Sequence, residues 1–246
     1  GSNALLSSDM TIAYMNGFQG NTINSESVLT MVKHFPGGGP QQNGLDPHLY
    51  SGRNQTYPGN NFDYHLIPFK DAINNNLKVI MPYYGIPIGQ TNEDVAMAYN
   101  EYILTDLLRE ELGFSGVICS DWGIITGRHW GVDELSIADR YQKSINAGID
   151  QYGGETETSY LIKLIKENII SEGRIDESVK RILVNKIELG LFDDPYVDEN
   201  KINDRVNTKK NIEAGLEAQR KSIVLLENNG ALPLKKGMKI FVDGLD

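Results

Sequence analysis

Cysteine is nearly absent from the sequence, with Cys119 the single example among 246 residues. One cysteine excludes a disulfide framework and a metal site built from several cysteines. The histidines show no His-x-x-x-His spacing, so neither a metal nor a cofactor is expected. No apolar run reaches 18 residues, the length that is typical of a membrane-spanning helix.

Positively charged residues are also fewer than negatively charged ones. Lysine and arginine number 23 against 33 aspartates and glutamates, which gives a formal net charge of -10. This balance argues against a nucleic acid or an anionic membrane surface as the partner, and it is compatible with a neutral substrate. The length allows one sizeable hydrophobic core, or one core and the start of another.

The most informative stretch runs from Gly113 to Gly123. Its apolar run at residues 117–119 has no polar alternation, which is typical of a strand buried on both faces in a parallel sheet. Asp121 follows at the carboxyl end of this strand, where α/β barrels place their chemistry. A simple helix cap is the alternative role for Asp121, but the indole of Trp122 beside it offers a surface on which a sugar can stack.

The rest of the pattern alternates strands with helices, which predicts βαβ units around a parallel sheet. Strands are expected at residues 30–34, 78–82, 117–119 and 149–152. Helices are expected at residues 9–19, 66–74, 93–112, 135–147, 158–172 and 176–191, the last of them capped by Asp176. A polar loop at residues 41–63 is long and rich in glycine and proline, which favours a functional segment.

The composition changes after Gly190. Residues 193–210 are charged, contain Pro195 and lack periodicity, which indicates a linker. A helix is expected at residues 208–226 and a strand at residues 239–242. We therefore expect three parts: a main α/β domain over residues 5–192, a linker and helix over 193–230, and the start of a second domain over 231–246.

Lys33 and His34 stand together at the end of the first expected strand, and three glycines follow at residues 37–39. An ion-paired lysine and a core histidine are one interpretation. Ligand contact is the favoured one, because glycines leave room for close approach at the end of a strand. A phosphate-binding loop is disfavoured, since the run lacks both the Walker spacing and a helix start.

Three stretches together resemble glycoside hydrolase family 3, which contains β-glucosidases and β-N-acetylhexosaminidases. They are Val32-Lys33-His34-Phe35-Pro36-Gly37-Gly38-Gly39, Leu112 to Trp122, and Ala218 to Asn228 followed by Leu232-Pro233-Leu234. Their order and spacing make the resemblance specific, and it covers nearly the whole chain.

The resemblance implies an α/β fold, a (β/α)8 TIM-type barrel followed by an α/β sandwich domain. Four barrel strands are expected, near residues 30, 79, 117 and 150, so residues 5–192 would be a partial barrel, its C-terminal half. Residues 231–246 would hold the first strand of the sandwich domain. An open half-barrel exposes two sheet edges, which proteins normally avoid. We therefore expect a fragment of a longer enzyme, or one piece of a cleaved chain whose partner is the remainder of that enzyme, and the fragment itself to be inactive.

The resemblance also implies roles for single residues. Asp121 matches the catalytic nucleophile, a carboxylate that attacks the anomeric carbon. Contacts with the sugar are implied for Lys33, His34, Tyr84 and Trp122. Tyr83 stays an alternative to its neighbour as the tyrosine that lies near the nucleophile.

Asp46-Pro47-His48 offers a candidate for the general acid. The hexosaminidase branch uses the histidine of an Asp-x-His dyad after the Lys-His stretch, and these residues lie about two positions further along. His48 would be the acid/base, and Asp46 would orient its imidazole. The alternatives are that these residues only form a turn, and that a glutamate of the second domain supplies the acid, as in the β-glucosidase branch.

We therefore expect a retaining, exo-acting β-glycoside hydrolase of the β-glucosidase type, with a carbohydrate as its substrate. The alternatives are a β-N-acetylhexosaminidase that uses the Asp46–His48 dyad, and an inactive carbohydrate-binding remnant. The resemblance to this family also suggests a bacterial enzyme that is periplasmic or secreted.

Overall fold

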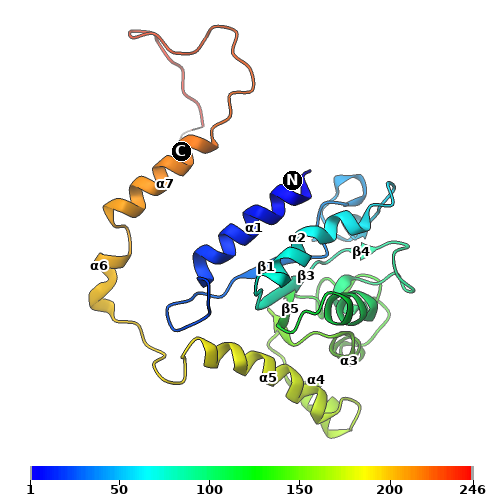
Figure 1. Ribbon diagram of the computed structural model, residues 1–246. Helices are drawn as coiled ribbons and strands as arrows, with labels where there is room; N and C mark the ends of the chain where they lie inside the picture. Colours follow the sequence, from blue (N-terminus) through cyan, green and yellow to red (C-terminus); the bar gives the residue numbers. More distant parts are fainter. Residues whose placement is uncertain (1, 245–246) are drawn as a thin grey trace. The chain divides into compact units, whose positions relative to one another are not determined.

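The computed structural model describes residues 2–244 (Figure 1). The chain divides into two compact units between Pro195 and Tyr196. The first unit contains a four-stranded sheet in the order β1-β3-β5-β6, and every pairing in it is parallel. Its strands are β1 (Met31–Phe35), β3 (Val79–Pro82), β5 (Val117–Trp122) and β6 (Gln151–Gly153). The expected α/β fold with a parallel sheet is confirmed.

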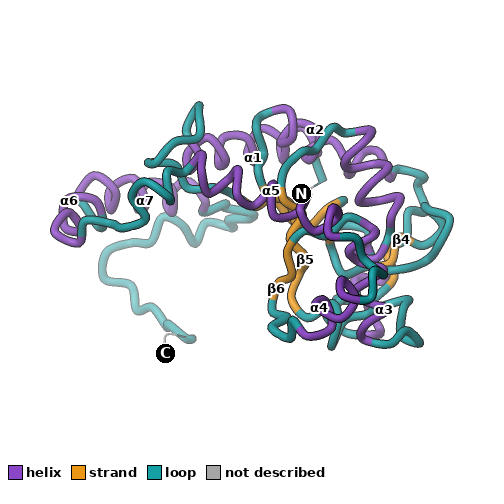
Figure 2. The backbone as a smooth tube through the Cα atoms, turned by 90° about the horizontal axis from the view of Figure 1, so that it is seen from below, coloured by secondary structure: helices purple, strands orange, loops and turns teal. Residues whose placement is uncertain are grey.

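The register of the sheet brings the carboxyl ends of its strands to one edge. Met31 pairs with Val79, Val79 with Val117, and Cys119 with Gln151. Figure 2 shows β5 and β6 side by side. Irregularities in the register lie near the carboxyl ends of β1 and β5. Side chains that follow these strands are therefore gathered at one end of the sheet, as in other parallel sheets.

Gly116 allows β3 and β5 to begin in close contact. A Cβ at this position would lie 2.3 Å from the carbonyl oxygen of Lys78. The N–H of Val117 donates a hydrogen bond to the same oxygen at 2.9 Å. Any larger residue at position 116 would push β5 away from its neighbour.

Helices pack around this sheet in the first unit. They are α1 (Ala4–Gln19), α2 (Phe62–Asn74), the π-helix η4 (Tyr102–Glu111), α3 (Ile137–Ala147), α4 (Ser159–Lys166) and α5 (Glu172–Glu188). Fully buried side chains from strands and helices form one core, among them Phe35, Leu66, Ile80, Leu104 and Ile118.

The helix expected at residues 93–112 is wrong over its first part. The chain forms only a short 3-10 turn, η3 (Met97–Tyr99), before η4 begins. The side chain of Asn100 accepts the N–H of Ile103 at 3.1 Å and donates to Thr91 Oγ1 at 2.8 Å. Asn100 therefore hydrogen-bonds to the first turn of η4 and also holds the preceding segment as a loop. The spacing of apolar residues alone does not reveal this loop.

The two helices expected after β6 have different bounds from those predicted. The helix expected at residues 158–172 is shorter, because α4 ends at Lys166 and Asn168 adopts a positive φ of 56°. Ser171, and not Asp176, caps α5 by accepting the N–H of Arg174 at 3.2 Å. Asp176 lies inside α5, one turn after its start.

The long loop at residues 41–63 is organised by short elements that the sequence did not reveal. It contains η1 (Gln42–Gly44), η2 (Tyr50–Gly52) and β2 (Asn54–Gln55). Strand β2 pairs in parallel with β4 (Ile86–Pro87). The loop that follows β1 is therefore bound to the loop that follows β3, at the carboxyl end of the sheet.

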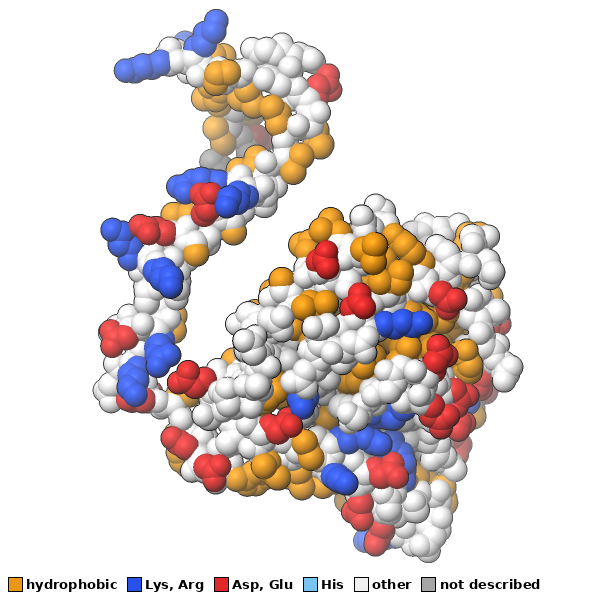
Figure 3. Space-filling model, in the orientation of Figure 1, with side chains coloured by type: hydrophobic (Ala, Val, Ile, Leu, Met, Phe, Trp, Pro, Cys, Tyr) orange, Lys and Arg blue, Asp and Glu red, His pale blue; other side chains and the backbone are white. Residues whose placement is uncertain are grey.

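The second unit contains η5 (Glu199–Lys201), α6 (Ile202–Arg205) and α7 (Lys209–Ser222), the last capped by Thr208. The strand expected at residues 239–242 is wrong, since these residues have no regular structure. A strand is stable only beside a partner, and residues 196–244 provide none. Ile223, Leu226 and Phe241 are exposed there, and apolar side chains are visible on the surface of this unit (Figure 3). The domain boundaries stay a prediction.

The outer face of α1 is apolar. Its exposed large hydrophobic side chains are Leu5, Leu6, Met10, Tyr14 and Phe18, and Figure 3 shows apolar side chains gathered over this part of the surface. Across residues 2–244, none of the helices combines the length and the apolar character that crossing a membrane requires.

A buried charge cluster lies around Asp150, directly before β6. Its carboxylate, which is 0% exposed, accepts hydrogen bonds from Arg109 at 2.6 Å and from Arg181 at 2.8 Å. Arg174 lies 3.8 Å away, and the N–H of Ile118 in β5 donates to the same carboxylate at 2.9 Å. Burial lowers the pKa of Arg109 to about 10, although Asp150 acts in the opposite direction. The cluster ties η4, β5 and α5 together.

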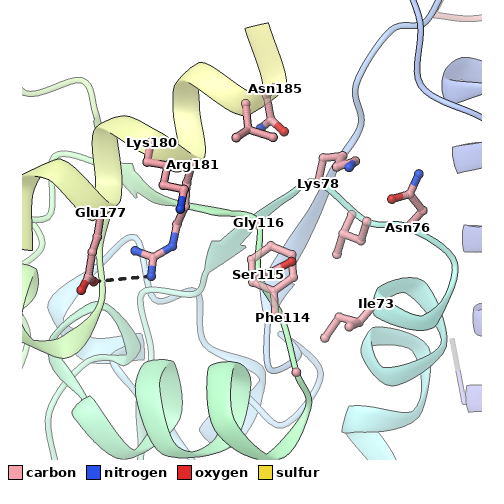
Figure 4. Close-up of a pocket in the computed structure, with 13 residues that line it drawn as sticks. Ile73, Asn76, Lys78, Phe114, Ser115, Gly116, Glu177, Lys180, Arg181 and Asn185 are labelled. Carbon is pink, nitrogen blue, oxygen red and sulfur yellow. Dashed lines mark ion pairs between the residues drawn. The ribbon is translucent and has the colours of Figure 1, made fainter. Parts of the chain in front are cut away.

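A pocket of about 470 Å³ lies beside this cluster, at the amino-terminal ends of β3 and β5 (Figure 4). Lys78 and Gly116 line it from the sheet, and α5 contributes Glu177 and Arg181, which form an ion pair at 3.6 Å. The pocket thus lies at the opposite end of the strands from the side chains that follow their carboxyl ends.

Candidate active site

Asp121 lies at the carboxyl end of β5 and is 9% exposed. Its Oδ1 accepts the N–H of Trp122 at 2.7 Å and the hydroxyl of Tyr84 at 2.8 Å. Its Oδ2 lies 3.2 Å from Nε2 of His34, which comes from β1. Three strands or their following loops therefore supply the groups around one carboxylate.

The pKa of Asp121 lies below its ordinary value. Burial by itself raises the pKa, but hydrogen bonds from His34, from the N–H of Trp122 and from Tyr84 together outweigh it. These donors stabilise the ionised carboxylate more than the protonated acid. Asp121 is thus a buried anion at neutral pH, which is the state that a nucleophile requires.

Tyr84 is placed by the segment that joins β3 to β4. Besides Asp121 Oδ1, its hydroxyl has the carbonyl oxygen of Trp122 as an acceptor, at 2.7 Å. Burial and the neighbouring Asp121 carboxylate raise the pKa of Tyr84, so the phenol stays protonated and remains a donor. The hydroxyl of Tyr83 is instead hydrogen-bonded to the side chain of Gln41. The geometry therefore favours Tyr84 over Tyr83 as the neighbour of Asp121.

His34 and Lys33 have different surroundings. His34 contacts Asp121, and its ring packs 5.2 Å from that of Tyr83, measured between centroids. Lys33 is exposed and lines a groove of about 590 Å³ between α1 and β1, together with Tyr14. Within residues 2–244 no hydrogen bond or ion pair joins Lys33 to Asp121, so its contact with a sugar stays a prediction.

The glycines that follow His34 pack against side chains. Cβ atoms added at Gly37 and Gly39 would lie 3.3 and 3.5 Å from His65, and one at Gly38 would lie 3.3 Å from Tyr83. The absence of side chains here lets the chain after β1 pass closely over α2 and Tyr83.

The indole of Trp122 forms part of the surface beside Asp121. It is 55% exposed and lies against the backbone of Gly153 and Gly154, where an added Cβ would come within 2.5 Å of the ring. The absence of side chains at these glycines therefore lets the ring pack closely against the end of β6. An exposed indole next to a buried carboxylate is a suitable wall for an apolar sugar face.

Asp46 and His48 are hydrogen-bonded to each other. Asp46 Oδ1 accepts from Nδ1 of His48 at 2.7 Å and from the His48 backbone N–H at 2.9 Å. These two hydrogen bonds lower the pKa of Asp46. Since the bond to Asp46 occupies Nδ1, Nε2 is left for another partner. The His48 ring packs edge-on against Tyr84, with 5.0 Å between centroids.

Sequence reasoning missed two residues of the segment that follows β5. The guanidinium of Arg128 lies 5.2 Å from the Tyr84 ring centroid, and its Nη1 donates to the Trp122 carbonyl at 3.3 Å. The indole N–H of Trp130 donates to the carbonyl of Pro47 at 2.8 Å. Their position in the loop after a barrel-type strand was the one available signal.

Within residues 2–244, no group of three or more histidine, cysteine, aspartate or glutamate side chains is arranged to hold a metal ion. The chemistry that the described side chains support is that of a buried carboxylate with its hydrogen-bond donors. A buried carboxylate and an imidazole that both contact Tyr84 suit attack on an acetal with protonation of the leaving oxygen.

Comparison with known proteins gives consistent matches. The family model described as "Glycosyl hydrolase family 3 N terminal domain" matches residues 1–184. "Beta-glucosidase C" of Emericella nidulans is 46% identical over 100% of this chain and 42% of its own length. "Periplasmic beta-glucosidase/beta-xylosidase" of Dickeya chrysanthemi is 36% identical over 98% of this chain and 41% of its own length.

Among solved structures, a glycoside hydrolase family 3 β-N-acetylglucosaminidase from Paenibacillus aligns with a TM-score of 0.79 at 26% identity. The alignment covers 96% of this chain and 44% of that one. The chain thus spans about two fifths of the length of the curated relatives named above.

Proposed function

Because the chain belongs to glycosyl hydrolase family 3, we propose that it carries the nucleophile of a retaining, exo-acting β-glucosidase-like hydrolase. The observation that carries this proposal is the environment of Asp121, a buried carboxylate kept ionised by His34, Trp122 and Tyr84. The name of the Emericella nidulans relative supports a β-glucoside as the substrate.

The reaction begins with attack of an Asp121 carboxylate oxygen on the anomeric carbon. The bond from that carbon to the leaving oxygen breaks, and the leaving oxygen takes a proton from the general acid. The resulting glycosyl ester is hydrolysed by water, which the same acid residue, now a base, deprotonates. Two displacements at one carbon retain its configuration. Trp122 bounds the sugar site beside the nucleophile.

Tyr84→Phe is expected to move the acidic limb of the pH–rate profile to higher pH. The change removes one of the donors that lower the pKa of Asp121, so the carboxylate is protonated earlier as the pH falls. Activity that depends on the anion is then lost at a higher pH than in the wild type. The profile of kcat/KM between pH 3 and 7 measures the shift, and an unchanged acidic limb would show that Tyr84 does not tune Asp121.

His48 is proposed as the general acid/base, with Asp46 holding its ring. The 2.7 Å contact between Nδ1 and Asp46 Oδ1 supports this role, as does the packing of the imidazole on Tyr84, whose hydroxyl bonds to Asp121. A doubly protonated ring would use its Nδ1–H for Asp46 and its Nε2–H for the leaving oxygen.

His48→Ala is expected to slow hydrolysis of substrates with poor leaving groups by about 10²- to 10³-fold, because general acid catalysis contributes a factor of this order. Activated aryl glycosides should lose far less, since their leaving groups depart without a proton. The measurement is kcat/KM against leaving-group pKa for a series of aryl β-glucosides. A uniform loss would make His48 a binding residue, and no loss would assign the acid to a residue outside these 246.

The alternative activity is that of a β-N-acetylhexosaminidase. The Asp46–His48 dyad favours it, and the Paenibacillus β-N-acetylglucosaminidase shares the fold. Paired assays with an aryl β-glucoside and the matching aryl β-N-acetylglucosaminide distinguish the two activities by kcat/KM. An inactive carbohydrate-binding remnant would bind a sugar and hydrolyse neither substrate.

The four parallel strands are proposed to be the C-terminal half of a (β/α)8 barrel. Their spatial order, β1-β3-β5-β6, follows the order of the chain, as in consecutive strands of a barrel. The remainder of the enzyme would then complete the barrel and the sugar site. A periplasmic or secreted location is also proposed, on the similarity to the Dickeya chrysanthemi enzyme, which is named as periplasmic.

A further inference from the structure

Trp130 contacts the middle residue of the Asp46-Pro47-His48 segment. It is 7% exposed, and its indole N–H donates to the Pro47 carbonyl in a buried hydrogen bond of 2.8 Å. The Tyr50 ring packs edge-on against the indole, with 5.6 Å between centroids. Trp130 therefore contacts the segment through its N–H, which reaches the peptide unit that joins Pro47 to His48.

Trp130 is itself held firmly. Its carbonyl accepts the N–H of Ala96 at 3.0 Å. The guanidinium of Arg140 donates to carbonyls on either side of it, those of Ile125 at 3.0 Å and Asp133 at 2.8 Å. The segment that begins at the end of β5 is thus fixed to α3, and it presents the indole N–H at a defined place.

The segment around Asp46 also depends on close backbone packing. A Cβ at Gly52 would lie 2.1 Å from the Asp46 carbonyl oxygen, and that oxygen accepts the N–H of Leu49 at 3.1 Å. Asp46 and His48 are themselves exposed, so burial of their own side chains does not fix them. Among residues 2–244, the indole N–H of Trp130 is the one side-chain donor that bonds to Pro47, and it ties Pro47 to the core of the first unit.

We propose that Trp130 is a positioning residue for His48. Its N–H holds the peptide between Pro47 and His48 and thereby keeps the imidazole packed on Tyr84, within reach of a sugar at Asp121. The inference rests on the proposed role of His48. Trp130 touches neither substrate nor reacting atoms, and acts through the segment that carries His48. The loop that follows β5 thus determines the position of His48, the proposed general acid.

Trp130→Phe tests the inference, because phenylalanine keeps an aromatic ring against Tyr50 and removes only the N–H and part of the indole. In the full-length protein, kcat/KM for aryl β-glucosides with poor leaving groups is expected to fall about 10- to 100-fold, since a misplacement of about 1 Å can cost 10²-fold. For substrates with good leaving groups kcat/KM should change by less than about 2-fold, because their first displacement needs no proton from His48.

A second measurement does not depend on turnover. In the wild type, we expect a ring-current shift of the His48 ring proton signals, because the Tyr84 ring centroid lies 5.0 Å from that of His48. Trp130→Phe should move these signals toward the values of a free histidine. Gly52→Ala perturbs the same segment independently and should move them too. Tyr102→Phe, which removes a hydroxyl from an exposed aromatic side chain on η4, is the matched control and should leave the signals and rates unchanged.

The outcomes separate the inference from the function on which it rests. If His48→Ala shows no dependence on the leaving group, the acid role of His48 fails and the inference fails with it. If His48→Ala shows that dependence while Trp130→Phe keeps wild-type rates and His48 signals, only the inference is overturned. If Trp130→Phe does not fold, Trp130→Leu, which also removes the N–H, decides by the same two measurements.

Discussion

Replacing Asp121 with asparagine is expected to lower kcat for an aryl β-glucoside by a factor on the order of 10⁴ or more, the scale seen when a covalent nucleophile is removed. The amide has nearly the shape of the carboxylate, and its oxygen can still accept from Trp122 and Tyr84. It cannot form the glycosyl ester, so the first displacement fails while the fold stays intact. Turnover measured together with the melting temperature tests both parts of this expectation.

Two further variants sharpen this test. Asp106→Asn makes the same chemical change at an exposed aspartate on η4 and should leave turnover unchanged. Asp121→Ala leaves space at the anomeric carbon, where added azide can attack an activated glycoside and form the glycosyl azide of inverted configuration. Turnover of Asp121→Asn within a few-fold of the wild type would remove Asp121 from the mechanism.

Asp150→Asn is expected to lower the free energy of unfolding by about 3–5 kcal/mol, the cost of removing one partner from a buried ion pair. The variant leaves Arg109, Arg174 and Arg181 around a buried position without the carboxylate that neutralises them. For a protein of this size the melting temperature should fall by roughly 10 °C. Thermal unfolding followed by circular dichroism measures the change.

The matched control for Asp150→Asn is Glu93→Gln, which breaks an ion pair that water reaches. The Glu93 and Lys143 side chains are 42% and 30% exposed, so the loss should stay below about 1 kcal/mol. If the two variants lowered the melting temperature equally, the buried cluster around Asp150 would not stabilise the fold more than an exposed ion pair does.

The sequence predicted the strand β5 and the placement of Asp121 at its end, because both are encoded locally. An unbroken apolar run predicts a strand buried on both faces, and the first polar side chain after it lies at the carboxyl edge. The contact between Asp46 and His48 was predictable for the same reason, since the two residues are only two positions apart. His34 lies near the carboxyl end of β1 and Tyr84 follows β3 in the same parallel sheet, so the two meet at that edge.

The parts that the sequence did not predict depend on contacts between distant segments. Trp130 reaches Pro47, and Arg128 reaches Tyr84, through a fold that no local pattern specifies. The pairing of β2 with β4 organises a loop whose composition indicates only turns. Likewise, the apolar spacing at residues 93–100 suggested a helix, whereas hydrogen bonds of Asn100 hold that segment as a loop.

The most direct test of the account is to trap the glycosyl ester on Asp121. A 2-deoxy-2-fluoro-β-glucoside with a good leaving group slows both displacements, and with such a leaving group the ester forms faster than water removes it. We predict that the full-length protein gains one fluoroglucosyl group, and that peptide mapping by mass spectrometry finds it on Asp121. A label on another residue, or no label while the same reagent releases its leaving group catalytically, would contradict Asp121 as the nucleophile.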